Sequence, residues 1–94
     1  MHFNVYAQTE LGGMLANGQG IAKDEIEAVK WYRKAAERGF AGAQVKLGAM
    51  YAIGSGIEKN QVEAVKWFRK AAEQGNAPAQ YILGTMYSDG EGVE

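Results

Sequence analysis

The stretch that decides the fold is EAVKWYRKAAERG at residues 27–39, because it returns as EAVKWFRKAAEQG at residues 63–75. A shift of 36 residues places 7–42 on 43–78 with 22 of 36 positions identical, and 79–94 repeats the first part of the unit. Self-similarity at such a period is typical of stacked-repeat proteins. We therefore expect one repeat domain over 1–94, divided into repeat one (7–42), repeat two (43–78) and a partial repeat three (79–94).

Each copy has the hydrophobic pattern of two amphipathic helices. In the first helix of repeat two, apolar residues recur at steps of three and four, namely Ala43, Leu47, Met50 and Tyr51. The second helix of repeat one has a wide apolar stripe that includes Trp31 and Tyr32. The pattern predicts about five helices, near 5–17, 24–38, 42–53, 60–74 and 77–88. Short connections favour antiparallel neighbours, so the expected fold is an all-α solenoid of antiparallel helix pairs.

The helix ends carry their own signals. Asp24 and Asn60 precede the second helices, and each is followed three residues later by a glutamate, which predicts a capping box. Gly39 and Gly75 follow the same helices and suit the left-handed position past a helix end.

Three glycines lie inside first helices, at Gly12, Gly48 and Gly84. Glycine in a helix interior costs about 1 kcal/mol relative to alanine. We expect a bulky ring from a neighbouring helix, such as Trp31 or Trp67, to lie against the backbone there and offset this cost.

The composition excludes several classes of function. Ten Lys and Arg against 11 Asp and Glu give a net charge of −1, which predicts neither nucleic-acid nor membrane binding. No stretch has the length of a membrane span or the pattern of a signal peptide, and the compartment stays open. Cysteine is absent and His2 is the only histidine, so we expect no disulfide, no metal, no cofactor and no catalytic residues.

Two motifs have an alternative interpretation. The GxG pairs at 18–20, 54–56 and 90–92 resemble phosphate loops, but each follows a predicted helix, which favours a turn that needs positive φ. Lys30, Arg33 and Lys34 beside aromatic residues resemble a nucleic-acid surface. Because these basic residues alternate with glutamates, we interpret them as a solvated helix face.

With LGxMYxxGxGI followed by EAVKWxRKAAExG, the chain resembles the Sel1-like repeat family, a relative of the tetratricopeptide repeats. The signature falls on Leu47, Gly48, Tyr51, Gly54, Gly56, Ala64, Trp67, Ala71, Ala72 and Gly75, with Leu15 in place of the tyrosine in repeat one. The resemblance implies a right-handed superhelix whose first helices line a concave surface, and an adaptor role that holds other proteins. Some cysteine-rich members are linked to β-lactam binding or hydrolysis, an activity that we do not carry over to a chain without cysteine.

Positions that differ between the copies are the ones free to carry individual function. By analogy with the tetratricopeptide groove, the differing positions of the first helices face a partner. The hypothesis is a non-enzymatic scaffold that binds a peptide or protein segment there; ordinary surface variation is the alternative. The candidate partner-binding residues are Thr9, Gly13, Asn17, Val45, Lys46, Ala49, Ile53, Tyr81, Thr85 and Asp89.

The last predicted helix has no second helix to pair with. We expect Leu83, Met86 and Tyr87 to lack the cover that their counterparts in repeat two receive. Three alternatives follow: the chain is a structural piece of a longer array, it self-associates through this end, or a partner completes it.

Overall fold

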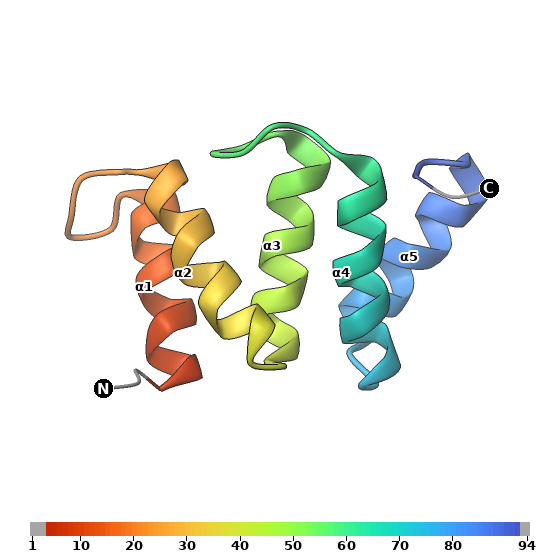
Figure 1. The fold of residues 1–94 in the computed structure, drawn as a ribbon, viewed down its shortest axis with the longest axis horizontal. Coiled ribbons are helices and arrows are strands. Elements are labelled where there is room, and N and C mark those ends of the chain that lie inside the picture. The colour runs from red at the N-terminus through yellow and green to blue at the C-terminus, as the bar shows by residue number, and fades with distance from the viewer. Residues whose placement is uncertain (1–3, 93–94) are drawn as a thin grey trace.

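The computed structural model describes residues 4–92, and within that range the chain forms five α-helices and no strand (Figure 1). His2 and the ends of the predicted domain lie outside the described residues. The helices agree with the predicted ranges to within one residue, so the all-α fold of paired helices is confirmed. They are α1 (Val5–Asn17), α2 (Glu25–Glu37), α3 (Ala41–Ile53), α4 (Gln61–Glu73) and α5 (Ala77–Asp89).

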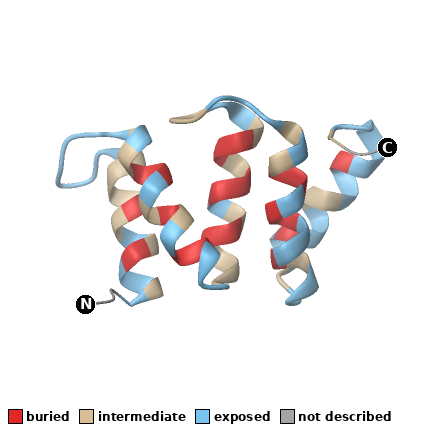
Figure 2. Ribbon diagram, in the orientation of Figure 1, coloured by how far each residue is buried: buried red, intermediate tan, exposed pale blue. Residues whose placement is uncertain are grey.

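Contacts between helices run mainly from each helix to the next along the chain. The helices therefore follow one another along the longest dimension of the molecule, which is 38 Å, with α1 and α5 at opposite ends (Figure 1). Buried residues run through α2, α3 and α4, whereas α5 is largely exposed (Figure 2). The core is thus formed where helices are covered on both sides, as in a solenoid.

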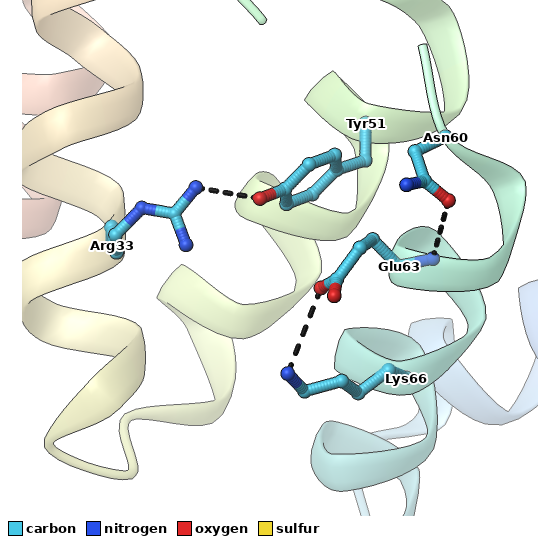
Figure 3. Close-up of polar contacts among 5 residues, drawn as sticks. All are labelled: Arg33, Tyr51, Asn60, Glu63 and Lys66. Carbon is cyan, nitrogen blue, oxygen red and sulfur yellow. Dashed lines mark hydrogen bonds and ion pairs between the residues drawn. The ribbon is translucent and has the colours of Figure 1, made fainter. Parts of the chain in front are cut away.

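Each second helix begins at a side-chain cap. Asn60 Oδ1 accepts the backbone N–H of Glu63 at 3.0 Å (Figure 3). The reciprocal half of the predicted capping box is not formed, because the N–H of Asn60 donates to the carbonyl of Tyr51 at 2.9 Å and Glu63 pairs with Lys66 at 3.7 Å. Asp24 repeats this arrangement at the start of α2. The cap residue therefore also ties its helix to the end of the preceding one.

Two of the three glycines inside the first helices face rings, but not the expected ones. A Cβ on Gly12 would lie 2.8 Å from the ring of Tyr32, and a Cβ on Gly48 would lie 3.0 Å from the ring of Phe68. The prediction of Trp31 or Trp67 was wrong by one residue, about 100° around the helix. Gly84 has no atom within 4 Å of its Cβ position, because no second helix follows α5 within residues 4–92.

The tryptophans lie beneath lysines of their own helices. Lys34 Nζ is 4.4 Å from the ring centre of half-buried Trp31. Lys66 and Lys70 lie over the ring of Trp67, which is buried, at 5.4 and 5.6 Å. Such positions allow a cation–π attraction and cover the ring with a lysine stem.

The arginines of the same motif join consecutive repeats. Arg33 Nη2 donates to the hydroxyl of Tyr51 at 2.6 Å, which links α2 to α3 (Figure 3). Arg69 donates to Tyr87 in the same way, 36 residues later. Arg33 is half-buried in this contact, so its assignment to a solvated face was wrong, whereas Lys30 is exposed and pairs with Glu27.

The last helix is only partly uncovered. Tyr87 is 48% exposed, whereas its counterpart Tyr51 is 9% exposed, and Leu83 is also less buried than Leu47. The prediction failed for Met86, which is buried because it belongs to the main core cluster.

Candidate functional site

A pocket of about 230 Å³ opens between α1 and α3, over α2. Three helices and the turn after α3 contribute to its wall. The lining residues are Ala16, Asn17, Glu25, Tyr32, Lys46, Ala49, Met50, Ile53 and Ser55.

The inner wall of the pocket is apolar. Tyr32 and Met50 are buried, and Ala16 and Ala49 are partly buried against the core. Tyr32 occupies this place because its ring packs on the side-chain-free surface of Gly12. Burial raises the pKa of the Tyr32 hydroxyl above its ordinary value, so this group stays a neutral donor well beyond neutral pH.

The rim of the pocket is polar, and its carboxylate, Glu25, already has two partners. The Ser55 hydroxyl donates to Glu25 Oε2, and Lys23 Nζ lies 3.9 Å from Glu25 Oε1. Lys46 is exposed and forms no hydrogen bond or ion pair within residues 4–92. The rim therefore presents one uncompensated positive charge beside an apolar wall.

The turn after α3 is held against α2 by close backbone approach. Gly56 has φ +72°, and a Cβ there would overlap the carbonyl group of Glu25. Gly92 approaches the carbonyl of Gln61 in the same way at the next junction. The predicted turns with positive φ are confirmed, and they fix Ser55 at the pocket rim.

The pocket brings together four of the ten candidate residues: Asn17, Lys46, Ala49 and Ile53. The hydroxyls of Thr9 and Thr85 donate to carbonyls four residues earlier in their own helices, at 2.7 and 3.1 Å. The six candidates that do not line the pocket are Thr9, Gly13, Val45, Tyr81, Thr85 and Asp89. Of these, Val45 packs partly against the core and Tyr81 is 79% exposed.

Sequence reasoning missed Glu25, Tyr32 and Ser55. All three differ from their counterparts in the other copies, since the residues 36 positions away are Gln61, Phe68 and Gln19. The comparison between copies could have found them, but it was limited to the first helices.

Residues 4–92 contain neither a cluster of metal-binding side chains nor a helix that could span a membrane. Within residues 4–92, no three His, Cys, Asp or Glu side chains gather closely enough to hold a metal ion. In the same part of the chain, no helix combines the length and the apolar character needed to cross a bilayer.

The chain is similar to known repeat proteins over nearly its whole length. A family model described as Sel1 repeat matches residues 5–40, 41–76 and 77–94. A Sel1 repeat protein from Oxalobacter formigenes has 48% identity and a TM-score of 0.95, over 97% of this chain and 37% of that one. A protective antigen of uropathogenic Escherichia coli with an SLR fold has 45% identity and a TM-score of 0.93, over 95% of this chain and 19% of that one. No curated protein matches the chain. The matched solved structures are thus much longer than the part this chain spans.

Proposed function

Because the chain belongs to the Sel1 repeat family, we propose that it is a protein-binding module without catalytic activity. It holds a peptide or protein segment against the face formed by α1, α3 and α5. The family fold stacks helix pairs and leaves their first helices in a row, which suits an extended segment or an amphipathic helix.

The observation that carries this proposal is the pocket between α1 and α3 with a large apolar side chain at its edge. Ile53 is 73% exposed there, although its neighbours Ala49 and Met50 are covered. Tyr81, on α5, is 79% exposed. Large apolar side chains that a partner can cover serve as anchors in protein interfaces, aromatic ones most often.

The arrangement of the second helices argues against nucleic acid as the partner. Single-stranded nucleic acids need exposed rings on which bases stack. Trp67 is buried, and the lysines of its own helix lie over its ring. The net charge of −1 gives no general attraction for phosphate.

Partner capture with two matched double variants tests the proposal. Ile53→Arg with Tyr81→Arg places charge on the first-helix face. Ile26→Arg with Val62→Arg makes the same kind of change on second helices, at positions that are 63% and 68% exposed and outside the pocket. The partner is cross-linked to the folded protein and identified by mass spectrometry.

We expect the first double variant to lose the partner and the second to retain it, with unchanged circular dichroism for both. A partner that both variants capture equally places the interaction elsewhere and refutes the proposal.

A further inference from the structure

We propose that the pocket between α1 and α3 binds one bulky apolar side chain of a partner segment, and that Lys46 pairs with an acidic side chain next to it. This inference rests on the proposed function and specifies the chemistry of the partner. It follows from the size of the pocket, its charge and one difference between the two copies of the repeat.

The volume of the pocket suits a single side chain better than a whole small-molecule ligand. Pockets for cofactors and drug-sized ligands have volumes of about 300–1,000 Å³. An apolar cavity of about 150 Å³ holds a benzene ring. At about 230 Å³, this pocket accommodates a phenylalanine or leucine side chain against Tyr32, Met50 and Ala49.

The charge at the rim determines which type of residue fits next to the apolar anchor of the bound segment. Glu25 accepts a hydrogen bond from the Ser55 hydroxyl and forms a surface ion pair with Lys23, whose Nζ lies 3.9 Å away. Lys46 has no partner within residues 4–92, and the amide of Asn17 lines the same pocket. An acidic side chain beside the apolar anchor complements this rim, whereas a basic one is repelled.

The Tyr32 hydroxyl is a third possible donor beside Lys46 and Asn17, and the second copy has Phe68 in its place. Tyr32 and Phe68 pack their rings in the same way, on Gly12 and Gly48. The hydroxyl that distinguishes Tyr32 forms no hydrogen bond within residues 4–92 and belongs to a residue that lines the pocket. Since Phe68 shows that the packing does not need a hydroxyl, this group is available to a bound segment.

Labelled peptides of equal length test the inference by fluorescence polarisation. Each carries a central phenylalanine in a glycine and serine background, flanked by two aspartates, two serines or two lysines. A fourth peptide has alanine in place of phenylalanine between the aspartates. We expect the aspartate peptide to bind about threefold or more tighter than the lysine peptide. We also expect it to bind about tenfold or more tighter than the alanine peptide.

Three variants assign the effect to residues. Lys46→Glu is expected to reverse the order of the aspartate and lysine peptides. Lys30→Glu makes the same charge change on the exposed face of α2, outside the pocket, and is expected to leave the order unchanged. Tyr32→Phe copies the residue at position 68 and is expected to weaken the aspartate peptide between about twofold and tenfold at an unchanged melting temperature.

Equal binding of the aspartate and lysine peptides overturns the inference, as does an equal response to Lys46→Glu and Lys30→Glu. Absence of binding by all four peptides overturns it too. The proposed function survives any of these results if the captured partner is still lost on Ile53→Arg with Tyr81→Arg. Failure of this inference and failure of the proposed function are therefore distinguishable.

Discussion

Replacing Gly48 by leucine tests how the helices of one repeat pack on each other. The site for a Cβ lies 3.0 to 3.1 Å from three carbons of the Phe68 ring, which is tighter than ordinary van der Waals contact. Phe68 is one of the two largest fully buried side chains of the described residues, so other side chains surround its ring. A leucine side chain therefore has to separate α3 from α4 or expel the ring.

The magnitude follows from three contributions. Overpacking a core costs about 1–3 kcal/mol. Partial exposure of a phenylalanine adds a share of the roughly 1.5–3 kcal/mol that its burial contributes. Removing glycine from a helix interior returns about 0.8 kcal/mol. The net expected loss is about 1–4 kcal/mol, which for a domain of this size lowers the melting temperature by roughly 4–30 °C.

Gly84 provides the matched control for this experiment. It occupies the same position in α5, yet no atom lies within 4 Å of its Cβ site. Gly84→Leu is therefore expected to raise stability by up to about 1 kcal/mol through helix propensity alone. Thermal and urea unfolding, followed by far-ultraviolet circular dichroism, measure both variants.

The reasoning is refuted if Gly48→Leu melts within about 3 °C of the unmodified chain. It is also refuted if Gly84→Leu is destabilised as much as Gly48→Leu, because the ring of Phe68 then has no part in the effect.

Two further predictions compare matched positions in the same way, and a third concerns pH. Tyr51→Phe removes a half-buried hydrogen bond from Arg33 and is expected to lower the free energy of unfolding in urea by about 0.5–1.5 kcal/mol. Tyr87→Phe, at the exposed counterpart, is expected to cost less than half of that. Equal losses contradict a role of the buried hydrogen bond in joining the repeats. Gly56→Ala combines a φ of +72° with overlap of a backbone carbonyl, whereas at Gly75 φ is +87° but the Cβ site is open. Gly56→Ala is therefore expected to lower the melting temperature more than Gly75→Ala. The reverse order contradicts the packing of the turn on α2. Burial raises the pKa of Tyr32 in the folded state, so folding stability is complete below the unfolded pKa of about 10 and falls as pH rises through the folded value. Spectrophotometric titration of the folded protein is expected to show a tyrosine transition above about 10 that Tyr32→Phe lacks, and an identical titration of the variant in that range contradicts the assignment.

The fold was predictable because its signals are local and repeated. Asp24 and Gly39 mark the two ends of α2, and the same signals return 36 residues later at Asn60 and Gly75. These boundaries of α2 and α4 follow from backbone groups that need a cap and from a glycine with positive φ, and both depend on residues within one turn.

The contacts between helices were less predictable, because a one-residue change in the helix turns a side chain by about 100°. Trp31 and Tyr32 are adjacent large rings in the sequence, and only the structure shows that Tyr32 faces Gly12 while Trp31 lies under Lys34. The prediction that Arg33 lies on a solvated face failed for a related reason. Its partner, Tyr51, belongs to the next repeat and lies 18 residues away, beyond the reach of a helical pattern.

The candidate site was found only in part, because its residues come from three separate segments. The first-helix comparison located Lys46 and Ile53 on α3 but could not show that Glu25 and Ser55 meet beside them. That meeting depends on the turn after α3 folding back onto the preceding repeat, a long-range contact with no local signal.

The two junctions between repeats show how the same backbone contact carries different surface chemistry. At the first, the acid is Glu25 on the helix and the donor is Ser55 on the turn. At the second, the acid is Glu91 on the turn and the donor is Gln61 on the helix, with Nε2 3.4 Å from Glu91 Oε2. The polar contact is kept while donor and acceptor exchange places, so packing does not require either residue type. Because the fold accepts both arrangements, the side chains at the pocket are free to vary with the partner that we propose.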